Sequence, residues 1–333
     1  MSRVLVTGGT GLVGRHVIPL LLARGEEVTA LARSKAAADD LRSLGAEPVA
    51  GDLTDAASLD RAVGGAAAVV HAGAVVLSRG DWRLYEATNV TPTRVLAHAC
   101  AAAGARLIHI SSVAVYGRKT TYDGGASSVT EAFGTERPLF PGDHYARSKR
   151  EAEQALWDVA RTTGLHAVTL RPCVIYGPGD RQFAVRVARV VRRGIAPLIG
   201  PGDNPLGVVY AGNVAAAVVA ALDRPAATGP FNVANDGVIS ARDFLTTFAE
   251  GMGVRLRLVR VPRAAAWTAA RGADAVLRLL RPRAPMTTLK TAVQFLANPN
   301  PYVSARAERE LEWRPAVAPR EAVLRTARWF VAA

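Results

Sequence analysis

A glycine-rich turn after the first apolar run constrains the fold of this chain more than any other feature of its sequence. The segment Thr7-Gly8-Gly9-Thr10-Gly11-Leu12-Val13-Gly14 links a strand-like run, Arg3–Thr7, directly to an amphipathic stretch, Leu12–Ala23. Gly8 permits a tight turn, Gly11 lets a ligand approach the backbone, and Gly14 lets a helix pack closely on the strand. Because the start of such a helix offers free N–H groups to phosphates, the turn predicts a parallel α/β fold with a pyrophosphate site.

Short apolar runs alternate with longer amphipathic stretches through the first two-thirds of the chain. This alternation is typical of strand–helix units in a parallel sheet. We therefore predict a doubly wound (Rossmann) α/β fold in which six strands carry helices on both faces. The predicted strands are Arg3–Thr7, Glu27–Ala32, Glu47–Ala50, Ala68–His71, Arg106–Ser111 and His166–Arg171, and the predicted helices are Leu12–Ala23, Ala36–Leu44, Trp82–Ala103 and Tyr145–Thr162.

The pattern changes after Pro172, where Gly- and Pro-rich turns such as Gly177-Pro178-Gly179 and Gly200-Pro201-Gly202 divide the chain into shorter pieces. We expect residues 1–172 to form the dinucleotide-binding core. Residues 173–333 are expected to form mainly a smaller C-terminal substrate lobe, with some segments returning to the core. Helices are predicted there near Asn213–Asp223, Ala241–Met252, Arg263–Leu280 and Arg320–Phe330.

Composition limits the partners that we expect. Half of the 333 residues are hydrophobic and the formal net charge is +13. The arginines are spread along the chain, and no helix-turn-helix, zinc-finger or RNP pattern occurs, so we expect no nucleic-acid partner. No apolar run reaches the ~20 residues that cross a bilayer. Cys100 and Cys173 form no metal-spaced cluster, so we expect a cytoplasmic protein without a metal site.

The end of the second predicted strand bears on the choice of dinucleotide. Sites for NAD usually carry an acidic residue there, whereas this chain has Ala32 followed by Arg33. Arg33 can pair with the 2′-phosphate of NADP, so NADP(H) is favoured and NAD(H) stays an alternative. One more surface arginine is the competing interpretation. Asp52, after the third strand, is expected either to accept from the adenine amino group or to cap the next helix.

A tyrosine and a lysine lie four residues apart at the start of a predicted helix. Tyr145 and Lys149 would share one face of it, and Lys149 is one of four lysines among 41 basic residues. We expect the ammonium to favour the phenolate and bring the pKa of Tyr145 closer to neutral, so that the phenol exchanges a proton with a substrate oxygen. Ser112, at the carboxyl edge of the fifth strand, can hydrogen-bond that oxygen, although it also fits a strand-end serine.

Together these residues resemble the extended short-chain dehydrogenase/reductases, the NAD-dependent epimerase/dehydratase superfamily, over nearly the whole chain. The matching motifs are Gly8/Gly11/Gly14, Gly51-Asp52-Leu53, His71-Ala72-Gly73-Ala74, Asn89-Val90, Ser112 with Val115-Tyr116-Gly117, Tyr145 with Lys149, Arg171-Pro172, Tyr176-Gly177-Pro178-Gly179-Asp180 and Leu311-Glu312-Trp313-Arg314-Pro315. One departure is Pro92, where many relatives have a glycine.

The resemblance implies a catalytic triad of Ser112, Tyr145 and Lys149. It also implies that the segment from His71 to Ala74 lines the cofactor and that Asn89 helps to order the site. With the residues discussed above, the expected cofactor-binding set is Gly8, Thr10, Gly11, Leu12, Val13, Arg33, Asp52, Leu53, His71, Ala72, Gly73, Asn89, Tyr145, Lys149, Arg171, Pro172 and Val174.

Departures from some branches of the superfamily narrow the reaction. Sugar-nucleotide dehydratases carry an Asp-Glu pair after the catalytic hydroxyl residue, where this chain has Val113 and Ala114. Members that act on nucleotide sugars usually have an asparagine at the position of Val174. The pattern from Arg171 to Asp180, followed by Val209-Tyr210-Ala211-Gly212-Asn213-Val214, is similar to the 3β-hydroxysteroid dehydrogenase branch. That branch includes sterol-carboxylate 3-dehydrogenases and 2-alkyl-3-oxoalkanoate reductases.

We therefore expect an oxidoreductase that moves a hydride between NADP(H) and a secondary alcohol or ketone of a hydrophobic, steroid-like or long-chain 3-oxo/3-hydroxy substrate. A nucleotide-sugar epimerase with tightly bound NAD stays an alternative. A non-catalytic dinucleotide-binding regulatory protein is a further alternative, against which the intact triad argues. The basic and apolar segment 263–296 is expected to pack on its own lobe, with peripheral membrane contact left open. The oligomeric state is also open, although relatives often form homodimers through helices that flank the sheet.

Overall fold

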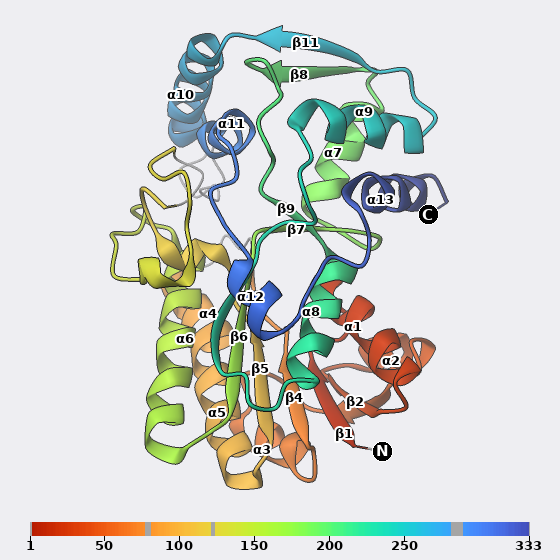
Figure 1. The fold of residues 1–333 in the computed structure, drawn as a ribbon, viewed down its shortest axis with the longest axis vertical. Helices are drawn as coiled ribbons and strands as arrows, with labels where there is room; N and C mark the ends of the chain where they lie inside the picture. Colours follow the sequence, from red (N-terminus) through yellow and green to blue (C-terminus); the bar gives the residue numbers. More distant parts are fainter. Residues whose placement is uncertain (1, 77–80, 121–123, 281–288, 333) are drawn as a thin grey trace.

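A computed structural model describes residues 2–76, 81–120, 124–280 and 289–332 (Figure 1). Its main element is a seven-stranded sheet with the strand order β10-β6-β5-β4-β1-β2-β3. Every pairing in this sheet is parallel. The strands are β1 (Arg3–Thr7), β2 (Glu27–Ala32), β3 (Glu47–Ala50), β4 (Ala68–His71), β5 (Arg106–Ile110), β6 (Ala167–Pro172) and β10 (Gly229–Val233).

Helices cover both faces of this sheet, which confirms the doubly wound α/β fold. One face packs on α1 (Leu12–Ala23), α2 (Lys35–Ser43) and α8 (Ala211–Leu222), in a core that contains Val4, Val6 and Ile108. The alternate residues of the same strands, such as Leu5 and Leu107, point to the other face and pack on three further helices. These are α3 (Ala56–Val63), α5 (Thr91–Ala103) and α6 (His144–Thr163).

The stretch Trp82–Ala103, expected as one helix, is interrupted. It consists of α4 (Trp82–Tyr85), a π-helical turn η1 (Glu86–Val90) and α5. Pro92 lies at the start of α5, where its ring would clash with the carbonyl of residue 88 in a regular α-helix and no N–H is available. The wider turn, with Thr91 N donating to Glu86 O, accommodates the proline. The π-helical turn therefore gives a structural explanation for Pro92, the departure from the family pattern noted in the sequence.

The chain after residue 172 contributes to both parts of the molecule. Strand β10 pairs with β6 and α8 packs on α1, so these two elements belong to the sheet layer. The remaining strands form two small parallel pairs, β7 (Val174–Tyr176) with β9 (Val208–Tyr210), and β8 (Ile195–Ile199) with β11 (Arg257–Val261). Figure 1 shows the β8–β11 pair at the end of the molecule away from β1.

Helices surround these small strand pairs. They are α7 (Phe183–Val191), α9 (Ala241–Gly251), α10 (Arg263–Leu280), α11 (Leu289–Ala297) and α13 (Pro319–Ala332). The short helix α12 (Ala305–Glu310) instead packs on β10 of the main sheet. Ala266, Ala270, Val293 and Ala297 bury one face of α10 and α11 against Ile199, so this part of 263–296 packs on its own lobe. Within the described residues, no helix is both long enough and apolar enough to span a bilayer.

Candidate active site

The glycine turn between β1 and α1 leaves no room for side chains. A Cβ at Gly14 would lie 2.4 Å from Gly8 O and 2.5 Å from Gly9 Cα, and one at Gly8 would lie 2.6 Å from Gly73 N. Gly8 also has φ +71°, in the left-handed region. The turn and the segment after β4 are therefore in backbone contact, and Ala72 and Gly73 lie against the glycine loop.

The loop opens onto the start of α1. Gly11 is the N-cap of α1 and provides no side-chain hydrogen bond to it, and Leu12 and Thr10 are partly exposed beside it while Val13 is buried. The free N–H groups and the helix dipole fit a diphosphate. The sequence analysis missed Arg15, whose Nε donates to Thr10 O at 3.1 Å and whose guanidinium pairs with Asp40 on α2. Arg15 thus fixes the loop on the helix side.

Arg33 and Asp52 lie near each other, beyond the ends of β2 and β3. Arg33 is exposed. Hydrogen bonds from the backbone and side chain of Thr54 hold the pKa of Asp52 below its usual range, with a smaller contribution from the charge of Arg33. The cap of α3 is Asp55, not Asp52, so the competing role considered for Asp52 is wrong. A Cβ added at Gly73 would lie 2.7 Å from Leu53 Cδ1. The segment after β3 thus reaches the segment after β4, which itself contacts the glycine turn.

Ser112 and Tyr145 meet at the carboxyl edge of the sheet. Ser112 follows β5 and caps a short 3₁₀ helix, η2 (Val113–Tyr116), with Oγ accepting from Ala114 N at 3.2 Å. Tyr145 is in the first turn of α6, which Asp143 caps by accepting from Ala146 N at 2.9 Å. The Ser112 hydroxyl lies close enough to the phenol to lower its pKa, as a hydrogen bond between the two would. Two residues more than thirty positions apart are thus directed at one point, as the proposed pair requires.

The pKa of Tyr145 differs from the expectation. Burial raises it to about 12, against a lowering influence from Ser112, and the nearby Asp143 and Tyr85 raise it further. Lys149 is not among the groups that shift it. The prediction that the Lys149 ammonium lowers the pKa of Tyr145 is therefore wrong. The desolvation of the buried phenol outweighs the other effects on its pKa. The phenol is protonated at neutral pH.

Lys149 is buried one helical turn after Tyr145. It is 4% exposed, and its Nζ donates to Ile110 O, at the end of β5, at 2.7 Å. Burial lowers the pKa of Lys149 to about 8, and the charge of Glu153 opposes this shift. The amine is therefore fixed beneath the same sheet edge that carries Ser112. Glu153 was missed, although the spacing 145, 149, 153 places it on the same face of α6.

Asn89 links three segments beneath the site. Its Oδ1 accepts from Val75 N at 2.8 Å, and its Nδ2 donates to Val75 O and to Ser148 Oγ, each at 2.9 Å. Ser148 Oγ in turn donates to Tyr145 O at 2.8 Å. The π-helical turn that contains Asn89 thus holds the segment after β4 against the first turn of α6. This agrees with the ordering role that the resemblance implies.

The buried guanidinium of Arg171 donates its hydrogen bonds to side chains of the protein itself. Its Nε donates to Glu153 Oε1 at 3.0 Å and its Nη1 to Tyr116 Oη at 3.0 Å, and it is 4% exposed. We assign it to holding β6 against α6, and direct cofactor binding by Arg171 stays an untested prediction. Pro172 is buried at the end of β6, and Val174 is half-buried at the start of β7 with its N donating to Gly207 O.

Comparisons with known proteins agree with this arrangement. The model of the "NAD dependent epimerase/dehydratase family" matches residues 4–235. A 4-hydroxy-2-methyl-3-oxo-4-farnesyl-3,4-dihydroquinoline-1-oxide ketoreductase of Stigmatella aurantiaca is 30% identical over 93% of this chain and 91% of its own. A 2-alkyl-3-oxoalkanoate reductase of Stenotrophomonas maltophilia is 30% identical over 97% of this chain and 98% of its own.

A solved structure extends the similarity to the fold. The UDP-glucose 4-epimerase of Thermus thermophilus in complex with NAD is 26% identical, with a TM-score of 0.68 over 99% of this chain and 100% of its own. Together with the extent of the family match and the two reductases, this shows that the chain belongs to the NAD dependent epimerase/dehydratase family.

Proposed function

We propose that this protein reduces a ketone on a hydrophobic substrate with NADPH, using Ser112, Tyr145 and Lys149. The observation that carries the proposal is the proximity of Ser112 to a protonated Tyr145 at the carboxyl edge of β5. A reduction needs an acid that gives a proton to the carbonyl oxygen, and a phenol with a pKa of about 12 enters the reaction in that form.

The residues divide the work of this reaction. The Ser112 hydroxyl donates a hydrogen bond to the carbonyl oxygen, and Tyr145 transfers its proton to that oxygen as negative charge develops there. Lys149, fixed through Ile110 O, is the cation that would donate hydrogen bonds to the nicotinamide ribose and orient it. The glycine loop and the start of α1 would hold NADPH, which would supply the hydride when bound. Solvent then returns the proton to Tyr145.

The named relatives support a hydrophobic ketone as the substrate. Two of them are reductases by name, one of a farnesylated quinoline oxide and one of 2-alkyl-3-oxoalkanoates. Val174 in place of a polar anchor agrees with an apolar substrate. Residues 173–333, apart from α8, β10 and α12, are the proposed substrate lobe. The alternative, a nucleotide-sugar epimerase, is supported by the similarity to a UDP-glucose 4-epimerase of Vibrio cholerae, 29% identical over 71% of this chain.

NADPH is the proposed dinucleotide because an exposed arginine follows β2. No carboxylate directly follows the strand, where it would bind a ribose 2′-hydroxyl, and Arg33 is free to form a charge-assisted pair with a 2′-phosphate. Arg33→Asp should reverse the preference, with the ratio of NADPH to NADH affinity falling at least tenfold. An unchanged ratio, measured from the fluorescence of bound NADPH and NADH, would reject this role.

Turnover with defined ketones tests the proposal. The pure protein is incubated with NADPH against 3-oxo steroids, long-chain 3-oxo acids and nucleotide sugars while the absorbance of NADPH is followed. Tyr145→Phe should lower kcat/KM by a factor of about 10² to 10⁴ with the NADPH dissociation constant nearly unchanged. Sugar epimerisation without added dinucleotide would support the alternative. Wild-type activity in Tyr145→Phe would overturn the assignment of the acid.

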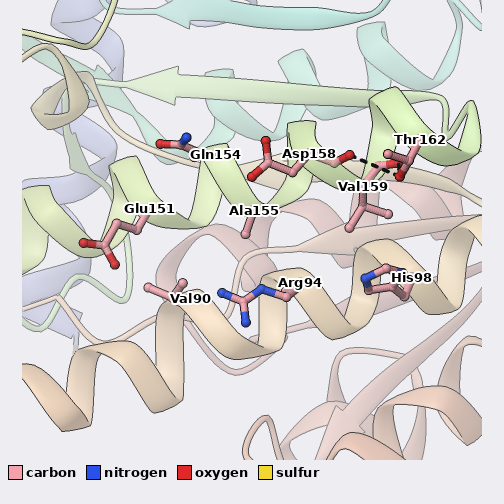
Figure 2. Close-up of a pocket in the computed structure, with 9 residues that line it drawn as sticks. All are labelled: Val90, Arg94, His98, Glu151, Gln154, Ala155, Asp158, Val159 and Thr162. Atoms are coloured by element: carbon pink, nitrogen blue, oxygen red, sulfur yellow. Dashed lines mark hydrogen bonds between the residues drawn. The ribbon is translucent and has the colours of Figure 1, made fainter.

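We also propose a homodimer through α5 and α6. A groove of about 460 Å³ lies between these helices. Figure 2 shows Arg94 and His98 on α5 and Glu151 and Asp158 on α6 along it. A two-fold axis along the groove would bring the basic edge of α5 onto the acidic edge of the partner's α6. Arg94→Glu should then weaken dimerisation, as measured by light scattering.

A peripheral membrane contact is a separate proposal and concerns α10 and α11, where Val276 and Leu289 are exposed.

A further inference from the structure

A row of polar side chains crosses the centre of the sheet beneath the candidate site. The pairing register aligns Thr7 of β1 with His71 of β4, His71 with His109 of β5, and His109 with Thr169 of β6. All four are at most 1% exposed. The residue two positions before each of the four lies in the core that packs on α3, α5 and α6, and alternate residues of a strand share a face. The row therefore points to that face of the sheet. Four polar groups thus occupy a layer where apolar side chains would be expected.

His71 has a fixed tautomer within this row. Thr93 Oγ1 donates its hydrogen to Asn89 O at 2.7 Å, so it accepts from His71 Nε2 at 3.1 Å. His71 Nδ1 therefore accepts from Thr7 Oγ1 at 2.7 Å. Burial and the charge of Lys149 lower the pKa of His71 to about 3. His71 is a neutral ring whose two nitrogens are both occupied.

His109 is different, because neither ring nitrogen has a hydrogen-bond partner among the residues that the structure describes. Its ring centroid is 5.1 Å from that of His71, with an angle of 33° between the planes. A buried neutral imidazole needs one donor and one acceptor partner, and leaving both unused is costly. The only other unpartnered atom of the row is Thr169 Oγ1.

Lys149 is the cation that faces this row. Its amine donates to the carbonyl of Ile110, the residue after His109, and this accounts for one of its three N–H groups. The charge of Lys149 acts on both His71 and His109, which it keeps neutral together with their burial. The other ionised group that acts on Lys149 is Glu153 of α6, which is itself paired with Arg171 of β6.

We propose that His109 is a positioning residue for Lys149. The imidazole of His109 accepts a second N–H of the buried amine through one internal water molecule. The inference rests on the proposed reductase function, in which Lys149 acts as a cation. A neutral acceptor stabilises the ammonium more than the uncharged amine. His109 therefore keeps Lys149 protonated to a higher pH than burial alone would allow.

Titration of Lys149 tests this directly, because the chain has four lysines. Lysine labelled with ¹³C at Cε gives one NMR signal for each, and Lys149→Arg identifies the signal of Lys149 by its loss. In His109→Leu the titration midpoint of Lys149 should fall by about one pH unit. The alkaline limit of kcat/KM for ketone reduction should move by the same amount. His109→Gln, whose amide oxygen can accept, should restore most of both shifts.

Two controls separate positioning from packing. His109→Leu removes unpartnered polar atoms from the core, so its Tm should not fall greatly, and His109→Phe replaces it if the leucine variant does not fold. Thr169→Val changes the same layer with little change in shape and should leave the Lys149 midpoint unchanged. An unchanged midpoint in His109→Leu and His109→Phe would overturn the inference, as would an equal shift in Thr169→Val. A shifted midpoint in a protein that reduces no ketone would instead reject the reductase function alone.

Discussion

Asp236 is a buried carboxyl that only neutral groups contact directly within the described residues. Its oxygens accept from Tyr210 N at 2.6 Å, from Asn213 Nδ2 at 2.7 Å and from Tyr176 Oη at 3.2 Å. Burial raises the pKa of Asp236 to about 6, although each of these hydrogen bonds lowers it. A single side chain outside the candidate site therefore makes the stability of the whole protein depend on pH.

The sign of this dependence follows from the raised pKa. Between the ordinary value of 3.8 and about 6, the folded protein holds a proton that the unfolded chain has released. The contribution of Asp236 to stability is therefore full at low pH and is lost as the pH rises through this window. Asp236→Asn removes it, so the unfolding free energy of the wild type relative to the variant should fall by about 2 kcal/mol between pH 4 and 7. Urea unfolding at several pH values measures the difference, and parallel curves would contradict the prediction.

At the scale of elements, the sequence predicted those helices and strands whose turn residues, caps and periodicity lie within one segment. The glycine turn, β1 to β4 and α1 were predicted to within a residue or identically, because turn residues and periodicity lie within one segment. The helix at Tyr145 was predicted as well, since Asp143 and Gly164 cap it. The helices α3, α7, α11 and α12 and all strands after β6 were not predicted. These strands are short, and they pair with segments that are distant in sequence. The spacing of Tyr145 and Lys149 and the place of Ser112 at a strand end could be predicted within single segments, whereas the Glu153–Arg171 pair and the row through His109 depend on strand register.

The α1 turn gives a prediction at this scale. In Gly14→Ala the new Cβ would meet the backbone of Gly8 and Gly9 at 2.4 and 2.5 Å, so the loop must move away from the helix start. We expect a loss of about 1–3 kcal/mol in stability and at least a tenfold weaker binding of NADPH, measured by fluorescence titration. Gly272→Ala in α10 is the matched control, because nothing lies within 4 Å of its Cβ and its φ is negative. Tight NADPH binding by Gly14→Ala would show that the loop is not the dinucleotide site.

The whole molecule is joined through Asn213, at the start of α8. Its Nδ2 donates to Asp236 Oδ1 and to Val317 O, its Oδ1 accepts from Val317 N, and its carbonyl accepts from Trp313 Nε1 at 3.0 Å. Two motifs of the resemblance, one around Asn213 and one around Trp313, thus meet in a single cluster. Asn213 connects the sheet layer to the segment that leads into α13.

Removing this connection should weaken the assembly of the two parts. In Asn213→Ala, three buried side-chain hydrogen bonds are lost, and we expect the unfolding free energy to fall by about 3 kcal/mol. Asn235→Ala, which removes only the bond from Gly237 N, should cost less than about 0.5 kcal/mol. Thermal unfolding followed by circular dichroism compares the two. Equal stabilities of these variants would mean that Asn213 does not join the parts.

The position of β10 at the edge of the sheet has a consequence for synthesis on the ribosome. Strand β6 ends at Pro172, but its outer neighbour is made of Gly229–Val233. A nascent chain that has emerged only through Pro172 would present β6 as an unpaired, apolar edge open to other chains. Chaperone protection is therefore most needed while the residues between β6 and β10 are being translated.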